Sequence, residues 1–324
     1  MESNGNYRHG EIKLFSCNAN LPLAQSIARH LGKPLCDSTV MQFSDSETYV
    51  RFDDTVRGTD VFIIQPTSTP VNDNLMELLI MTDAMRRASA QRITAVVPYF
   101  GYARQDRKDR SHAPITAKLV ANMLAAAGVD RVVSMDLHSP QVQGFFDVPF
   151  DHLRGTKLFA KYYKDKLAQD GDYVVVSPDM GSVARVRAFA KQLDLPVAIV
   201  DKRRPKADVT EVINIIGEEA INGRNVILID DMISTGGTLI NSVQAIKDKG
   251  AKSVYAFITH PVLSGEAKAK IENSALDKLF VLDTINVPKD NMPMNMEIIS
   301  VAKYFAEAIN CIHEGKAISA LFDE

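Results

Sequence analysis

The sequence predicts an α/β fold made of two related domains, each a mostly parallel sheet flanked by helices. Three observations predict it: a length of 324 residues, an alternation of β-branched runs with helix-periodic stretches, and an internal repeat. Hydrophobic cores stop growing as chains lengthen, and chains split into units of about 100–150 residues, so two domains are expected. The 46% hydrophobic and 24% charged residues exclude a disordered or fibrous protein.

Seven apolar runs are predicted to be strands, and two amphipathic stretches are predicted to be helices. In chain order the strands are Asp60–Ile64, Ile93–Val97, Arg131–Met135, Tyr173–Val176, Val197–Val200, Val226–Ile229 and Ser253–Ile258. The helices are Asn74–Ala88, before the second strand, and Ser182–Gln192, before the fifth. Strands that alternate with amphipathic helices are typical of βαβ units on a parallel sheet.

The internal repeat relates residues 115–138 to residues 237–260. Both segments run through a helix, a capping glycine, a strand and a histidine, with identical spacing between the shared residues. The repeat predicts an N-terminal domain over 1–150 and a C-terminal domain over 151–324, with a last helix that could pack back on the N-terminal domain.

Charge and cysteine content exclude several classes of protein. A net charge of −3 provides no basic field for nucleic acid or an anionic membrane, so any polyanionic ligand must be bound by local cations. Three scattered cysteines are too few for a disulfide framework or a cysteine zinc site. The first residues lack the apolar core of a signal peptide, and no run of eighteen apolar residues occurs, so we expect a cytoplasmic protein.

The segment Val226–Thr238 (VILIDDMISTGGT) contains the most informative motif. An apolar strand is expected to deliver Asp230 and Asp231 at its C-terminal end, where two acids suit the vicinal hydroxyls of a ribose. A loop then opens a helix, and its residues are Ser234, Thr235, Gly236, Gly237 and Thr238. Glycines let a ligand approach the backbone, and the N–H groups of a helix start attract phosphate. No Gly-Lys-Ser/Thr follows, and the acids precede the loop, so neither a Walker loop nor a dinucleotide fingerprint fits.

Three further segments place charged side chains where α/β proteins keep their sites. Asp201–Pro205 (DKRRP) holds three successive cations after a strand, a pattern that a solvated charge run also produces. Tyr102–His112 (YARQDRKDRSH) gathers four cations with no apolar residue to bury, which predicts an exposed, mobile loop. His138 and Asp179 each follow an apolar strand, at the edge where ligands of α/β proteins bind.

The Val226–Thr238 motif resembles the 5-phosphoribosyl-1-diphosphate (PRPP) motif of the phosphoribosyltransferase superfamily. Six other segments are similar to those of ribose-phosphate pyrophosphokinases, also called PRPP synthetases: FSDSE (43–47), YFGYARQDRKDRSHAPITAK (99–118), DLHSPQVQGFFDVPFDHL (136–153), SPDMGSVARVR (177–187), DKRRP (201–205) and THPVLSG (259–265). The resemblance runs from about Lys13 to Phe322, nearly the whole chain.

The resemblance implies transfer of the diphosphoryl group of ATP to the 1-hydroxyl of ribose 5-phosphate, giving PRPP and AMP. Positioning and charge neutralisation supply most of the rate of such reactions. Lys202 would be the catalytic cation, and Arg204 would contact the ribose phosphate or the transition state. The acid pair and the loop after it would bind ribose 5-phosphate. The Tyr102–His112 loop would close over ATP, with Arg104 and Gln105 contacting the nucleotide.

The resemblance also implies the nucleotide and metal contacts. Phe43 would stack on adenine, while Asp45 and Glu47, with Ser46 between them, would form its recognition turn. His138 and Asp179 would hold Mg²⁺ with ATP. In the family the recognition turn reaches a neighbouring subunit's site, so a homohexamer is implied.

Four residues depart from the usual family pattern. Ser46 stands where glycine is usual, Met180 where histidine or alanine is usual, and Ser234 where aspartate is usual. Ala317 replaces the first serine of a C-terminal pair whose second member, Ser319, is retained. In the family these serines serve a site where phosphate activates and ADP inhibits, so both effects are expected to be weaker here.

Two other functions stay open at this point. A phosphoribosyltransferase would share the Asp230–Thr238 region but would need neither the FSDSE turn nor the ARQDRK loop. A nonenzymatic synthetase-associated subunit would share the fold, but such proteins usually disrupt the catalytic positions, which are present here. A repressor on the same fold would add a basic helix-turn-helix, and none is visible.

Overall fold

The computed structural model describes residues 9–169, 171–203 and 212–318. The chain divides into two compact units. The first comprises the chain up to Arg154, together with Thr284–Asn286 and the segment from Ser300 onward. The second comprises Gly155–Asp283 and Val287–Ile299. Both units are α/β, which confirms the predicted fold class. Within the described ranges no helix is both long enough and apolar enough to span a bilayer.

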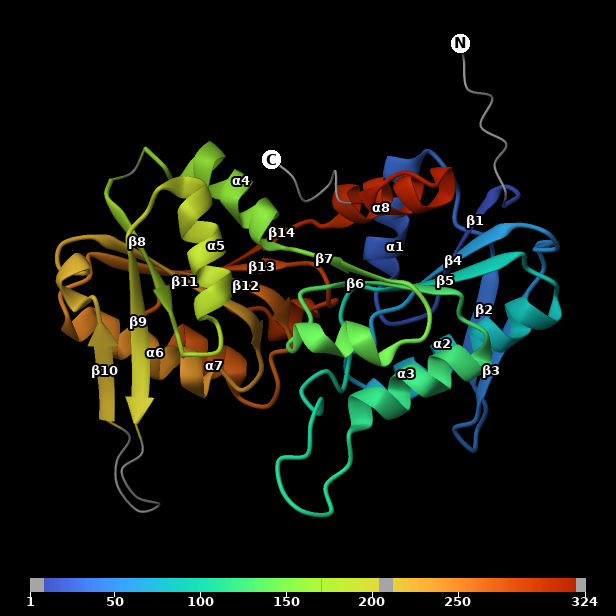
Figure 1. The fold of residues 1–324 in the computed structure, drawn as a ribbon, viewed down its shortest axis with the longest axis horizontal. Helices are drawn as coiled ribbons and strands as arrows, with labels where there is room; N and C mark the ends of the chain where they lie inside the picture. The colour runs from blue at the N-terminus through green and yellow to red at the C-terminus, as the bar shows by residue number, and fades with distance from the viewer. Residues whose placement is uncertain (1–8, 170, 204–211, 319–324) are drawn as a thin grey trace, which may run out of the picture. The chain divides into compact units, whose positions relative to one another are not determined.

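The first unit is built on a five-stranded parallel sheet with the order β1-β4-β5-β6-β7. Its strands are β1 (Ile12–Ser16), β4 (Asp60–Ile64), β5 (Arg92–Val97), β6 (Arg131–Met135) and β7 (Phe150–Leu153). Its helices are α1 (Leu21–Leu31), α2 (Val71–Arg87), α3 (Thr116–Ala127), α8 (Ala302–Glu314) and the 3₁₀ helix η1 (Pro140–Phe145). Helices α2 and α3 cover one face of the sheet, and α1 and α8 cover the other (Figure 1). A separate antiparallel hairpin joins β2 (Ser38–Gln42) to β3 (Thr48–Phe52).

The second unit is built on a seven-stranded sheet with the order β10-β9-β8-β11-β12-β13-β14, parallel except for β10. Its strands are β8 (Tyr173–Ser177), β9 (Val197–Arg203), β10 (Val212–Ile216), β11 (Asn225–Ile233), β12 (Ser253–Pro261), β13 (Lys278–Leu282) and β14 (Met296–Ile299). Its helices are α4 (Thr156–Lys166), α5 (Val183–Leu193), α6 (Gly237–Asp248), α7 (Ala267–Glu272) and two 3₁₀ turns, η2 (Glu218–Ala220) and η3 (Lys289–Asn291). Helices α6 and α7 lie on one face, and α4 and α5 on the other (Figure 1).

The central strands are largely apolar because helices bury both faces of each sheet. All five residues of β4 and the first five of β11 are buried. Side chains of a strand alternate between the two faces. Val226 and Leu228 therefore pack in the cluster that includes α6, while Ile227 and Ile229 belong to the opposite face.

The internal repeat is present as a repeated structural unit. Helix α3 is followed by Gly128 at φ 113° and by β6, and helix α6 is followed by Gly250 at φ 82° and by β12. Both glycines adopt the left-handed conformation that commonly ends a helix. All seven predicted strands and both predicted helices occur; β4 and β6 have the predicted bounds, and the others have shifted ends.

Three strands, β9, β11 and β12, run further than their apolar residues predict, and β12 ends at Pro261 instead of Ile258. Strand β11 continues through both acids to Ile233, because its backbone stays in register with β12 as far as Pro261. Strand β9 continues to Arg203, because its last residues pair with β10, a strand that we did not predict. The acids and the first cations of the DKRRP segment therefore lie within strands instead of after them.

Candidate active site

The acid pair of the second unit lies at the C-terminal end of β11. The side chain of Asp230 is 18% exposed, and that of Asp231 is 7% exposed. The Asp231 backbone N–H donates to Asp230 Oδ1 over 2.9 Å. Burial, together with the neighbouring charge of Asp231, raises the pKa of Asp230 to about 7. The pair therefore offers a ligand a polar but poorly solvated contact.

The loop after β11 has the form expected for a phosphate site. Gly236 precedes α6 with φ 79° and ψ −13°, a conformation that favours glycine. Gly237 begins the helix, and a Cβ built on it would meet nothing within 4 Å. The Ser234 carbonyl accepts the Ser264 N–H over 3.0 Å, which ties the loop to the residues after β12. The first N–H groups of a helix have no intrahelical acceptor, so α6 presents donors beside the open space at Gly237.

Asp179 lies in the loop between β8 and α5 and is joined to the acid pair through one residue. Its Oδ1 accepts the backbone N–H of Ser182 over 2.9 Å. The Ser182 hydroxyl in turn donates to Asp230 Oδ1 over 2.7 Å. Asp179, Asp230 and the predicted phosphate loop, residues 234–238, thus gather at one edge of the second sheet, as the carboxyl ends of parallel strands predict.

Arg185 lies one turn further along α5, and sequence reasoning missed both it and Ser182. Its guanidinium Nη1 lies 3.4 Å from one oxygen of Asp230 and 3.4 Å from one oxygen of Asp231. The signal was present in the SPDMGSVARVR segment. Residues 182 and 185 are three positions apart at a helix start, so their side chains share one face.

The predicted catalytic cations are only partly described. The backbone of Lys202 lies opposite that of Ile213 in the β9–β10 ladder, and the structure does not describe its side chain. Arg204 lies outside the described residues.

The FSDSE segment forms the tip of the β2–β3 hairpin in the first unit. Phe43 N–H donates to the Glu47 carbonyl over 2.9 Å, and Glu47 N–H donates to Asp45 Oδ1 over 3.2 Å. The Phe43 residue is 48% exposed, and its ring centroid lies 5.4 Å from that of Tyr49. Ser46 adopts φ 70°, which explains why glycine is usual at this position in the resembled family. The tip therefore presents an exposed aromatic ring and two carboxylates.

The Tyr102–His112 segment is fixed at its beginning and exposed beyond it. The Gln105 carbonyl accepts the Ala117 N–H over 3.1 Å, and its side-chain oxygen accepts the Thr116 hydroxyl over 2.5 Å. These contacts fasten Gln105 to the first turn of α3. Arg104 beside it is exposed. In this arrangement Arg104 is accessible to a ligand, while the side-chain oxygen of Gln105 is already engaged.

The two predicted metal residues belong to different units. His138 is an exposed residue just after β6 in the first unit, and Asp179 is half-buried in the second. Within the described ranges, no three histidine, cysteine or acidic side chains gather as a metal cluster. A carboxylate such as that of Asp179 suits Mg²⁺, which binds through one or two carboxylates plus substrate phosphates and waters. Asp179 therefore fits such a role. His138 is a less usual ligand, because Mg²⁺ prefers oxygen atoms to the nitrogen atoms of an imidazole.

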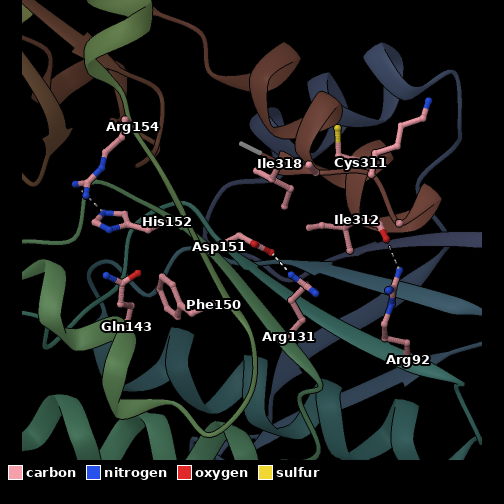
Figure 2. Close-up of a pocket in the computed structure, with 13 residues that line it drawn as sticks. Arg92, Arg131, Gln143, Phe150, Asp151, His152, Arg154, Cys311, Ile312 and Ile318 are labelled. Carbon is pink, nitrogen blue, oxygen red and sulfur yellow. Dashed lines mark hydrogen bonds and ion pairs between the residues drawn. The ribbon is translucent and has the colours of Figure 1, made fainter. Parts of the chain in front are cut away.

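A cavity of about 750 Å³ lies in the first unit, beside the C-terminal end of α8 (Figure 2). Its lining residues are Arg92, Arg131, Gln143, Phe150, Asp151, His152, Arg154, Cys311, Ile312, Gly315, Lys316, Ala317 and Ile318. Arg131 Nη1 contacts Asp151 Oδ2 over 2.5 Å, and Arg92 Nη2 donates to the Ile312 carbonyl over 3.1 Å. The volume falls in the range of small-molecule sites, and the lining is rich in cations.

Comparison with known proteins gives consistent results along the chain. Residues 12–128 match the N-terminal domain of ribose phosphate pyrophosphokinase, and residues 202–323 match the phosphoribosyl synthetase-associated domain. The chain is 54% identical over 321 residues to a ribose-phosphate pyrophosphokinase of Staphylococcus saprophyticus, covering 99% of both chains. A Staphylococcus aureus protein of the same name is 53% identical, with 99% of both chains covered. The crystal structure of phosphoribosylpyrophosphate synthetase from Mycobacterium smegmatis superposes with a TM-score of 0.89 at 40% identity, covering 94% of this chain and 99% of that one.

Proposed function

The chain belongs to the ribose-phosphate pyrophosphokinase family of enzymes, and we propose that it transfers the diphosphoryl group of ATP to the 1-hydroxyl of ribose 5-phosphate. The products are 5-phosphoribosyl 1-diphosphate and AMP. The observation that supports this most directly is the gathering of Asp179, the Asp230–Asp231 pair and the phosphate loop at one edge of the second sheet.

Ribose 5-phosphate would bind along β11 and the start of α6. Its 5-phosphate would accept hydrogen bonds from the N–H groups around Gly237, with the Ser234, Thr235 and Thr238 hydroxyls nearby. Its 2- and 3-hydroxyls would donate to Asp230 and Asp231. Held at both ends, the sugar keeps its 1-hydroxyl in one position for attack, which lowers the entropic part of the barrier.

The nucleotide would be bound by Phe43, Asp45, Ser46 and Glu47 at the hairpin tip and by Arg104 and Gln105. For Gln105 this requires its side-chain oxygen to leave the Thr116 hydroxyl, or its amide to contact the ligand. Asp179 and His138 would hold Mg²⁺ with ATP. When bound, the ion neutralises phosphate charge during transfer.

Lys202 and Arg204 would stabilise the charge that develops on the transferred group. Lys202→Ala is expected to lower kcat by about 10²–10³-fold with little change in KM, the usual effect of losing one preorganised donor to a transition state. Steady-state kinetics for both substrates measure this. A variant within a few-fold of the natural enzyme would exclude Lys202 from the chemistry.

A labelling experiment tests the reaction itself. With γ-labelled ATP, the label is expected in the ribose product, and AMP is expected to form in equal amount and only when ribose 5-phosphate is present. ADP as the stoichiometric product would instead show transfer of a single phosphoryl group. Pyrophosphate release from PRPP with a free base would favour the phosphoribosyltransferase function.

We also propose that the cavity of the first unit is an effector site for phosphate and ADP. It is lined by Arg92, Arg131, Arg154 and Lys316, and Ala317 lies among its residues. The volume of about 750 Å³ suits a nucleotide.

The oligomer that we propose is a homohexamer in the cytoplasm. Light scattering after size-exclusion chromatography, with and without phosphate, tests the oligomeric state.

A further inference from the structure

Ser182 occupies a position at which a serine side chain normally caps a helix, yet its hydroxyl contacts Asp230 instead. It is the N-cap residue of α5, where a serine oxygen usually accepts an N–H from the first helical turn. Here the side chain makes no capping hydrogen bond. The residue is 6% exposed, and its hydroxyl donates to Asp230 Oδ1 over 2.7 Å. The local helix forgoes its cap, and the hydroxyl goes to the acid pair instead.

The donors around Asp230 all converge on one of its two oxygens. Oδ1 accepts the Ser182 hydroxyl over 2.7 Å and the Asp231 N–H over 2.9 Å, with Arg185 Nη1 at 3.4 Å. Within the part of the chain that the structure describes, no donor contacts Oδ2. A carboxylate whose one oxygen is saturated has its plane fixed, so the other oxygen is directed toward a single place.

We propose that Ser182 is a positioning residue, which anchors Oδ1 of Asp230 so that Oδ2 is held ready to accept a hydroxyl of ribose 5-phosphate. This role rests on the proposed function of the acid pair. The backbone N–H of Ser182 donates to Asp179 Oδ1 at the same time. One residue therefore sets the position of the ribose acid relative to the carboxylate proposed to hold Mg²⁺.

The same hydrogen bond favours the ionised form of Asp230. Burial and the neighbouring charge of Asp231 raise the pKa of Asp230, while the Ser182 hydroxyl and the Arg185 charge lower it. These are the groups that face Asp230 from β11 and α5. Removal of the hydroxyl is expected to raise the pKa further, so that more Asp230 is protonated near neutral pH and fewer acceptors remain for the sugar.

The experiment compares the natural enzyme with Ser182→Ala and Ser182→Thr between pH 5.5 and pH 9. Ser182→Ala is expected to raise the KM for ribose 5-phosphate about tenfold at pH 7, with a smaller change in kcat. The midpoint of the acid-side rise in KM is expected to move up by roughly half a pH unit to one unit. Ser182→Thr keeps the hydroxyl and is expected to restore both values. The substrate's own phosphate titrates identically in every variant, so differences between variants report on the protein.

Ser274→Ala is the matched control, since it removes a hydroxyl that donates to the Ile271 carbonyl over 2.7 Å in the same unit. Ser182→Cys, with a weaker donor of similar shape, replaces alanine if that variant folds poorly. Unchanged KM and midpoint in Ser182→Ala, or a Thr variant as impaired as alanine, would overturn the positioning role. A natural enzyme that forms no AMP in response to ribose 5-phosphate would instead overturn the proposed function. Calorimetric titration of ribose 5-phosphate without ATP gives a readout independent of turnover.

Discussion

At the scale of single residues, Ser46 shows how a side chain can be retained at a conformational cost. Its φ of 70° lies in the left-handed region, where a residue with a Cβ is disfavoured by roughly 1–2 kcal/mol. Glycine would remove this cost but would lose more entropy on folding, so Ser46→Gly is expected to stabilise the protein by about 0.5–1 kcal/mol. Urea denaturation measures this. Ser44→Gly in the same turn is the control and is expected to destabilise, and an equal gain from both would refute the explanation.

Asp230 gives a prediction about stability and pH. A carboxyl whose folded pKa is raised contributes stability that is present below its unfolded pKa of 3.8 and is lost as pH rises through about 7. Asp230→Asn abolishes this loss, so its stability relative to the natural enzyme is expected to improve by about 2 kcal/mol between pH 5 and pH 8.

Thermal or urea denaturation at the two pH values measures the Asp230→Asn effect. Asp165→Asn, at an exposed carboxylate of α4, is the control for the substitution itself. A relative stability of Asp230→Asn that falls with rising pH would contradict the predicted sign.

At the scale of elements, the connection from β11 to α6 contains two adjacent glycines, and we expect alanine to have opposite effects on stability at the two positions. Gly236 has φ 79°, so Gly236→Ala is expected to destabilise by about 1 kcal/mol through backbone strain. Gly237 lies within the helix with open space where its Cβ would be, so Gly237→Ala is expected to gain up to about 1 kcal/mol from helix propensity.

The kinetic effect of Gly237→Ala is expected to be opposite to its effect on stability. The new methyl group would project into the space proposed for the 5-phosphate and raise the KM for ribose 5-phosphate while leaving the KM for ATP nearly unchanged. Steady-state kinetics beside urea denaturation tests both effects. A stabilised variant with an unchanged KM would place the phosphate elsewhere.

At the scale of the whole molecule, the proposed regulation by phosphate involves the C-terminal segment. Ala317 lines the cationic cavity of the first unit and cannot donate a side-chain hydrogen bond. Ala317→Ser is expected to tighten the apparent phosphate activation constant by roughly ten- to a hundredfold, the value of one hydrogen bond to a charged ligand. The saturated kcat is expected to stay nearly unchanged. Ala188→Ser on α5 is the control, and an unaltered phosphate response in Ala317→Ser would dissociate this terminus from regulation.

Several features of the protein were determined by the sequence alone, because their causes are local. Runs such as Asp60–Ile64 are strands because they consist mainly of β-branched and aromatic apolar residues, and α3 and α6 are followed by Gly128 and Gly250, which can adopt a left-handed conformation. The conformation of the predicted phosphate loop follows from the sequence for the same reason, since its glycines and the helix start are contiguous, and its binding of phosphate stays a prediction. The predicted roles of Lys202, Arg204, His138 and Asp179 stay predictions.

The tertiary structure alone decided which distant groups meet. The register of β11 with β12 carries the acid pair into a strand, although the apolar run stops at Ile229. The packing of α5 turns Ser182 away from its own helix and toward Asp230, 48 residues later in the chain. The cavity joins the starts of β5 and β6 to the end of α8. Such contacts depend on strand order and helix packing, which no local pattern encodes, because their free energy appears only when the whole unit is folded.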